Sequence, residues 1–215
     1  MKNGDYGFDE IIDLEEILEN LKSNVSEDIV TFNDVVNLNG AINREVYIGK
    51  IIDGTGTAVD NYIRFWNRQD EKANIPVDKR KPIKLYVDST GGCLIDTFTM
   101  IDSISLSKTP VWTICTGAAY SGGFFTFIAG HKRFAYPTAS FMFHEGSTGN
   151  MADAGKFRNY ADFYYKQLDE LKDITLRYSS ISDDEYEKHK KDDWWFTSKE
   201  GIQYGFVDEI VTSSL

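Results

Sequence analysis

The chain has 215 residues, of which 41% are hydrophobic and 14% aromatic, and this size and composition predict one compact domain with a full core rather than a disordered chain. Its 34 acidic residues outnumber its 23 basic ones, and the net charge of −11 disfavours nucleic-acid binding because no basic surface would balance the phosphates. The longest apolar run, Phe124 to Ala129, is too short to cross a bilayer, and the first residues lack the features of a secretory signal. We therefore expect a cytoplasmic protein that does not bind a membrane.

Apolar residues at helical spacing among acidic side chains predict an acidic helix over residues 8 to 21. A polar, turn-rich stretch that includes Asn39-Gly40 follows this helix and precedes the apolar segment Val46 to Ile48. We therefore divide the chain near residue 40, into an acidic helical N-terminal extension (1–40) and a main domain (41–215).

The main domain alternates strands with helices. The charged segment Asp70 to Lys81 predicts a solvated loop. After it, a strand is predicted at Ile83, Leu85 and Val87, a turn at Gly91-Gly92, and a helix whose inner face is Leu94, Ile95, Phe98, Ile101 and Ile104. A second strand at Val111 to Cys115 is followed by a turn at Gly117 and by a helix that begins near Ser121. This repeated order of strand, glycine turn and helix favours an α/β domain.

A third strand is predicted at Phe141 to Phe143, followed by a long, aromatic-rich helix over residues 152 to 178. The aromatic residues of that helix predict either an oligomer interface or part of the core. Ser182 and Thr197 each stand three residues before a glutamate, the capping-box spacing that starts a helix. Gly205 predicts the end of the last helix, and residues 206 to 211 predict a short final strand.

Ser121 lies among small residues where a strand gives way to a helix, in the run Ala119-Tyr120-Ser121-Gly122-Gly123. This is a variant of the nucleophile elbow: small neighbours let a carbonyl approach the hydroxyl, and exposed amides at the helix start can stabilise negative charge. The same residues are also typical of a helix cap with close-packed glycines.

A serine nucleophile needs a base, and the chain has three histidines. His144 follows an apolar strand and opens a loop, whereas His131 and His189 lie beside lysines and are predicted to be solvated. A packed histidine at the strand end is the alternative for His144. The two cysteines, Cys93 and Cys115, fit a reducing compartment, and their spacing excludes a structural zinc site.

Four segments in order resemble motifs of the Clp proteolytic subunit, a ClpP-type serine peptidase, over roughly residues 44 to 211. They are the strand and glycine turn Leu85 to Gly92, the serine segment Thr113 to Gly123, the histidine segment Ala139 to His144, and the aspartate segment Asp193 to Thr197 with the signature Tyr204 to Asp208. The resemblance implies a ClpP/crotonase-like α/β fold, in which repeated ββα units form a superhelix and the long helix protrudes as a handle.

The resemblance also implies a catalytic triad. Ser121 corresponds to the nucleophile, His144 to the general base and later acid, and Asp193 to the carboxylate that orients the imidazole. Asp192 is adjacent, and we prefer Asp193 because Trp195-Phe196-Thr197 aligns best with the run that follows the family's aspartate.

The oxyanion hole implied by the resemblance consists of the backbone N–H groups of Gly92 and Gly122. The chain departs from the family pattern at Thr90, where proline is usual, at Gly122, where a bulkier apolar residue is usual, and at Glu145, where glutamine is usual. Residues 1–40 do not resemble the N-terminal segment that lines the family's axial pore.

The function implied by the resemblance is that of an ATP-dependent, Clp-type serine endopeptidase that cleaves unfolded polypeptides inside an oligomeric chamber. Its partners would be further copies of the chain in stacked rings and an AAA+ unfoldase, and no metal or organic cofactor is implied. A divergent or virus-encoded member that processes assembly proteins would use the same chemistry. Two other classes stay open, a crotonase-type acyl-CoA enzyme and an inactive structural subunit of a mixed ring.

Overall fold

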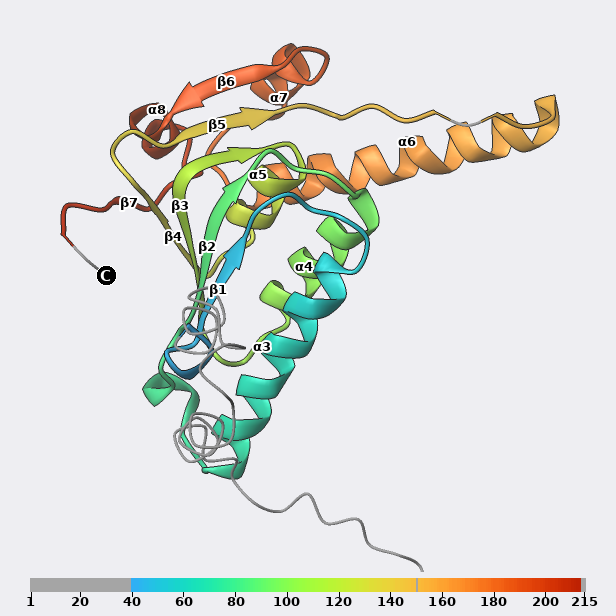
Figure 1. Cartoon of the computed structure of the whole chain (residues 1–215). Coiled ribbons are helices and arrows are strands. Elements are labelled where there is room, and N and C mark those ends of the chain that lie inside the picture. Colours follow the sequence, from blue (N-terminus) through green and yellow to red (C-terminus); the bar gives the residue numbers. More distant parts are fainter. Residues whose placement is uncertain (1–39, 150, 214–215) are drawn as a thin grey trace, which may run out of the picture.

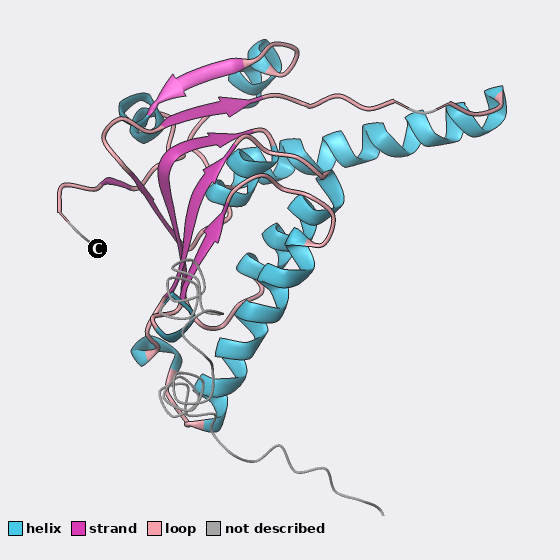
Figure 2. Ribbon diagram, in the orientation of Figure 1, coloured by secondary structure: helices cyan, strands magenta, loops and turns pink. Residues whose placement is uncertain are grey.

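The computed structural model describes residues 40–149 and 151–213, so the predicted helix over residues 8 to 21 lies outside the described part. The described residues form a mixed α/β structure in which helices pack around a seven-stranded sheet (Figures 1 and 2). Within these ranges no helix is both long and apolar enough to cross a membrane.

The sheet is built around one long strand. Its main path is β1-β2-β3-β4-β7, with all neighbours parallel. The first half of β3 pairs with β4, whereas its last three residues pair with β5, and β6 runs antiparallel to β5. The strands are β1 (Glu45–Ile48), β2 (Ile83–Ser89), β3 (Val111–Tyr120), β4 (Lys132–Ala135), β5 (Ser140–Phe143), β6 (Trp194–Thr197) and β7 (Glu209–Ile210).

Helices α3 and α4 lie together on one side of the sheet, and α6 projects away from it (Figure 1). The helix α8 begins with a complete capping box at Thr197, and the hydroxyl of Ser182 accepts the N–H of Glu185 at the start of α7, so both predicted caps are present. The helices are α3 (Thr55–Lys72), α4 (Leu94–Ser105), α5 (Gly122–Ile128), α6 (Ala154–Arg177), α7 (Asp183–His189) and α8 (Ser198–Gln203), with a 3-10 turn at Val77–Lys79.

The sequence missed α3, and the predicted solvated loop from Asp70 to Lys81 is wrong at its start. Asp70 lies in α3 and is fully buried, because it continues the inward stripe of Val59, Ile63 and Trp66 at helical spacing. Its carboxylate forms a paired contact with the guanidinium of Arg44, with one N–O distance of 2.6 Å. A buried ion pair, which single-residue patterns do not reveal, makes this acidic residue part of the core.

Three further expectations are corrected. The strand predicted at Val111 to Cys115 continues to Tyr120, so Gly117 lies inside β3 rather than in a turn. The helix α4 turns Ile101 and Ile104 inward, but Ile95 is 73% exposed because it lies on the opposite face. The structure adds β4, which was not predicted, and the last strand is only Glu209–Ile210.

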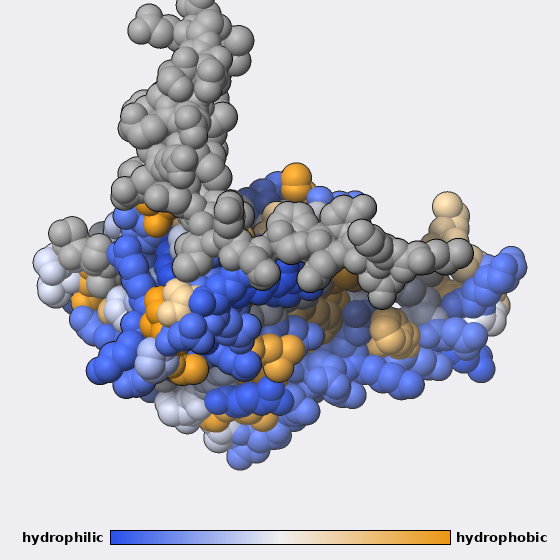
Figure 3. Space-filling model, turned by 90° about the horizontal axis from the view of Figure 1, so that it is seen from below, coloured by the Kyte–Doolittle hydropathy of each residue, from blue (hydrophilic) through white to orange (hydrophobic). Residues whose placement is uncertain are grey.

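The long helix predicted over residues 152 to 178 is α6, and its two halves have different surroundings. Leu168, Leu171 and Ile174 near its C-terminal end are buried, whereas Phe157 and Phe163 near its start are 50% and 58% exposed. Elsewhere, the face shown in Figure 3 is mostly hydrophilic, with apolar residues in separate patches. The projecting half of α6 therefore carries large apolar groups that the chain itself leaves uncovered.

An aromatic cluster joins the helix α5 to the strands β5 and β6. The ring of Phe124 in α5 lies 6.0 Å from that of Phe143 in β5 and 5.8 Å from that of Phe196 in β6, measured between centroids. Phe206 packs 5.0 Å from Phe124 in the same way. Edge-to-face contacts of this kind fix ring orientation as well as burying area. This aromatic cluster therefore anchors the residues just before α5, just after β5 and just before β6.

The turn after β2 packs so closely against the end of β3 and against the segment after β1 that only glycine fits at two successive positions. Gly91 and Gly92 both have positive φ angles, 91° and 151°. A Cβ on Gly91 would lie 2.7 Å from that of Ser121, and one on Gly92 would lie 1.8 Å from the carbonyl oxygen of Ile51. The Cβ of Ser121 and the carbonyl oxygen of Ile51 cannot move away from such contacts without shifting the main chain. Both positions therefore require glycine.

Replacing Gly92 with alanine should destabilise the fold by about 2–3 kcal/mol, because the added methyl group meets main chain and the φ angle is strained for any other residue. Urea unfolding at a fixed protein concentration measures the change. Gly49→Ala is the matched control, since nothing lies within 4 Å of a Cβ there. Equal unfolding midpoints for the two variants would contradict the proposed constraint.

Candidate active site

Ser121 follows directly after β3 and has a backbone conformation that few non-glycine residues adopt. Its φ and ψ angles are 52° and −124°. The N–H of Ser121 donates to the carbonyl of Met142 in β5, 2.9 Å away, and its own carbonyl accepts from Phe124 and Phe125 at the start of α5. A sharp turn between strand and helix, held on both sides in this way, is the setting in which a serine hydroxyl is presented to a substrate.

His144 and Asp193 face each other because of the register between β5 and β6. The last antiparallel pair of these strands is Phe143 with Trp194. The next pair in the same register is His144 with Asp193, whose side chains lie on the same face of the two strands. The carboxylate is thus brought to the histidine from a segment 49 positions later in the chain.

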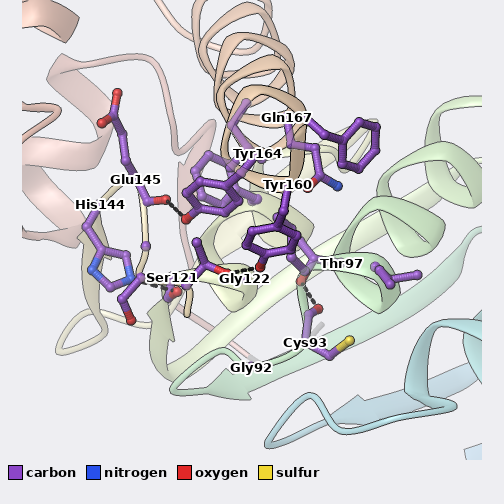
Figure 4. A pocket seen from close by; sticks show the side chains of 18 residues that line it. Gly92, Cys93, Thr97, Ser121, Gly122, His144, Glu145, Tyr160, Tyr164 and Gln167 are labelled. Atoms are coloured by element: carbon purple, nitrogen blue, oxygen red, sulfur yellow. Dashed lines mark hydrogen bonds between the residues drawn. The ribbon is translucent and has the colours of Figure 1, made fainter. Parts of the chain in front are cut away.

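The three residues form one chain of hydrogen-bonding distances. The Nε2 of His144 lies 2.8 Å from the Oγ of Ser121, and its Nδ1 lies 3.0 Å from the Oδ1 of Asp193 (Figure 4 shows the first contact). The side chain of His144 is 27% exposed and that of Asp193 is 56% exposed. Since a carboxylate only accepts, the arrangement assigns the proton of the neutral imidazole to Nδ1 and leaves Nε2 as the acceptor for the serine hydroxyl.

Asp192 lies outside this chain of contacts. Its backbone N–H donates to the carbonyl of His189, at the end of α7, and its residue is exposed. It lies in a bend before β6 begins at Trp194, and the carboxylate that contacts His144 is that of Asp193. The geometry therefore distinguishes between the two neighbouring aspartates.

Two backbone amides next to Ser121 have no protein acceptor among the described residues. They are the N–H groups of Gly92 and Gly122, the two that the family resemblance implies for an oxyanion hole, and both residues line the same cleft. A Cβ on Gly122 would lie 3.5 Å from the nitrogen of Gly92, so the two main-chain segments are in contact. These amides are free to donate to an oxygen atom placed between them.

The absence of a side chain at position 122, a departure from the family pattern, has a local cause. A Cβ there would lie only 2.4 Å from the hydroxyl oxygen of Thr97 in α4. That hydroxyl donates to the carbonyl of Cys93, 2.8 Å away, so it is held in place. Thr97 therefore fills space beside the serine that a larger residue at position 122 would otherwise occupy.

The cleft in front of Ser121 has a volume of about 650 Å³ (Figure 4). Its walls come from α4, α5, α6 and the segment after His144. The sequence analysis did not identify the contribution of α6, because helical spacing shows which residues share a face but not what that face covers. The lining residues from α6 are Tyr160, Phe163, Tyr164, Gln167 and Leu171.

The other two histidines do not line this cleft. His131 is exposed, as predicted, although its Nδ1 accepts the N–H of Val111. The prediction that His189 is solvated is wrong: its ring stacks on Trp194 at 4.1 Å, and its Nε2 bonds to Glu185 at 2.9 Å. The neighbouring lysines gave a misleading picture because their charge says nothing about the face of α7 on which the imidazole lies.

Both cysteines are free thiols. Burial raises the pKa of Cys115 to about 12, so this thiol is neutral and packs as a small apolar group. Cys93 hydrogen-bonds to Asp96, and this contact, together with the N–H of Gly56, holds the pKa of Asp96 below its usual value. Asp53, Cys93 and Asp96 bring atoms that could bind a metal ion within 4.8 Å of one another. The carboxylate of Asp96, however, already accepts hydrogen bonds from Cys93 and from the N–H of Gly56.

The sequence model of the Clp protease family matches residues 76–214, which is more than half of the chain. The matched range contains Ser121, His144 and Asp193, as well as both glycines whose amides face the cleft. This chain belongs to the Clp protease family.

Proposed function

We propose that this chain is a serine endopeptidase that cleaves unfolded polypeptides or peptides through an acyl-enzyme. The observation that carries the proposal is the unbroken chain of contacts from Asp193 through His144 to Ser121. Membership of the Clp protease family indicates a serine peptidase, and three groups in this order act in such enzymes as orienting carboxylate, base and nucleophile.

Acylation begins with the hydrogen bond between Ser121 and His144. The Nε2 atom takes the hydroxyl proton while Oγ forms a bond to the carbonyl carbon of the substrate, and Asp193 stabilises the resulting imidazolium. His144 then gives the proton to the leaving amine as the C–N bond breaks, and the acyl group stays on Oγ. In deacylation His144 takes a proton from water as the water oxygen bonds to the acyl carbon. The C–Oγ bond then breaks, His144 returns the proton to Oγ, and the carboxylic acid product leaves.

The amides of Gly92 and Gly122 supply the oxyanion hole in this proposal. During each attack the carbonyl oxygen becomes negatively charged, and fixed N–H groups stabilise this charge without reorganising. The support for this role is that both amides border the cleft and donate to no acceptor within residues 40–149 and 151–213. The glycine at position 92 lets the main chain that carries this amide pack against the carbonyl of Ile51, where a Cβ would not fit.

We infer that the chain has the repeated ββα superhelix of ClpP and crotonase-type folds, with α6 as its handle and residues 1–40 as a separate extension. Exposed Phe157 and Phe163 on the projecting half of α6 support burial against a second copy. The family resemblance supports stacked rings that enclose the sites, an AAA+ unfoldase that supplies substrate, and a cytoplasmic location.

Ser121→Ala should abolish both peptide hydrolysis and labelling by a fluorophosphonate probe, because it removes the nucleophile while changing little of the fold. Intact mass and site mapping of the labelled protein provide the measurement, with Ser105→Ala, in α4 and outside the cleft, as the control. A label on another serine would contradict the assignment. A crotonase-type enzyme would instead keep its turnover of a CoA thioester in Ser121→Ala, and an inactive ring subunit would not be labelled at all.

Asp193→Asn should be nearly inactive, since loss of this carboxylate favours the wrong imidazole tautomer and costs on the order of 10⁴ in rate in related triads. Asp192→Asn should change the rate by less than about tenfold, as expected for a solvated carboxylate. The rates of peptide hydrolysis and of probe labelling at Ser121 measure both effects. The reverse order would place the third member of the triad at Asp192.

Light scattering at micromolar concentration should give a mass many times the 24.5 kDa of one chain. Replacing both Phe157 and Phe163 with serine should lower this mass, because it removes the apolar surface proposed to lie between copies. Leu106→Ser is the control, since Leu106 is 82% exposed but lies at the end of α4. A strict monomer of the unmodified chain would argue against an enclosed chamber.

Removal of residues 1 to 25 should leave the particle intact, because this segment lies outside the region that resembles the family.

A further inference from the structure

The segment that follows His144 has no place in the sheet or in a helix. The strand pairing ends at Phe143, and residues 145–149 make no backbone–backbone hydrogen bond to the described parts of the chain. The strand therefore fixes the main chain on the N-terminal side of His144 only. On the C-terminal side, the peptide bond between His144 and Glu145 needs a contact outside the sheet, because a shift of this bond would rotate the backbone that carries the imidazole.

Tyr164 in α6 makes that contact. Its hydroxyl donates to the carbonyl oxygen of Glu145, 3.0 Å away, at the residue directly after His144. A Cβ on Gly146, which has a φ of 80°, would lie 3.5 Å from the same hydroxyl oxygen, so the hydroxyl lies against the main chain of two successive residues. Burial raises the pKa of Tyr164, which keeps the hydroxyl protonated and able to donate.

The position of this hydroxyl is itself well supported. The ring of Tyr164 packs against the hydrophobic core, while its oxygen reaches the segment beside it. One helical turn earlier, the hydroxyl of Tyr160 contacts the hydroxyl of Thr148. Residues four apart share a face of a helix, and Figure 4 shows both tyrosines extending from α6 toward the cleft. Within the described residues, these two contacts are the hydrogen bonds that join residues 145–149 to the rest of the chain.

We propose that Tyr164 is a positioning residue for the general base, with Tyr160 as a second, weaker support of the same segment. This inference rests on the proposed function, in which His144 moves protons between Ser121, the leaving group and water. The cross-strand pair at Phe143 and the hydrogen bond to Glu145 hold the residues on either side of His144. Together they keep Nε2 at its 2.8 Å distance from the serine hydroxyl. Misplacing a catalytic group by even a fraction of an ångström lowers the rate, because the reacting atoms must be aligned before the step begins.

Tyr164 also lines the cleft, so a role in binding substrate has to be separated from a role in positioning the base. The two roles predict different kinetics. A positioning residue acts on the chemical step and lowers kcat, whereas a residue that only contacts substrate raises KM. A positioning residue also acts through His144, so its loss has no further effect once the base is gone.

The test compares Tyr164→Phe, Tyr160→Phe and the control Tyr165→Phe, which removes a hydroxyl from an exposed neighbour on the same helix. The ring and its packing are kept in all three, and urea unfolding checks that the fold is unchanged. We expect Tyr164→Phe to lower kcat for a short peptide, and the rate of fluorophosphonate labelling at Ser121, by about tenfold with little change in KM. Tyr160→Phe should lower both rates by less, and Tyr165→Phe should match the unmodified chain.

The same Tyr164→Phe change is then made in a His144→Ala background, where residual labelling of Ser121 should show no further loss. An equal loss in both backgrounds, or a change in KM alone, would overturn the positioning role. If the unmodified chain is labelled at Ser121 but Tyr164→Phe and Tyr165→Phe have the same kcat and labelling rate, this inference is overturned and the proposed function stands. A wild type that is not labelled at Ser121 would instead overturn the proposed function and this inference with it.

Discussion

The contact between the turn after β2 and the turn after β3 is the constraint on which the site depends. Gly91 lies against Ser121 there almost without an intervening side chain, and the next residue, Gly92, lies against Ile51 in the segment after β1. The same contact brings the amides of Gly92 and Gly122 to one side of the serine hydroxyl. Any residue larger than glycine would separate the turns, and both the strained serine and the pair of free amides would be lost together.

A second level of order comes from the pairing of β5 with β6. Parallel strands could bring Ser121 and the end of β5 to one edge of the sheet, but they could not supply the third group from the far end of the chain. The antiparallel addition of β6 does this through its register, which sets Asp193 opposite His144. The aromatic cluster around Phe124 then holds α5, β5 and β6 as one body, so each of the three side chains lies directly beside an element that is packed into the same cluster.

The elements that support the site from outside are less regular. Residues 145–149 leave the sheet and contact α6. Two tyrosines of this helix supply the hydrogen bonds that strand pairing no longer provides. Elsewhere in the fold, the buried pair of Arg44 and Asp70 joins the region before β1 to α3. Both cases use a polar contact between distant segments where the local sequence gives no regular structure of its own.

The sequence by itself determined the alternation of β2, α4, β3 and α5, the long helix α6 and the capped start of α8, because these follow from apolar periodicity and from capping residues that act over a few positions. It also singled out Ser121 and His144 from their local setting, whereas Asp193 and the two glycines of the oxyanion hole came only from a resemblance to a family whose motifs occur in the same order. Tertiary structure alone decided the rest. It buried Asp70 in a helix, extended β3 through Gly117, and set Asp193 rather than Asp192 opposite His144 by strand register. It also brought the hydroxyl of Tyr164 to the carbonyl of Glu145. Each of these depends on which distant segments become neighbours, and pairing partners and registers are properties of the folded chain that no local pattern of residues contains.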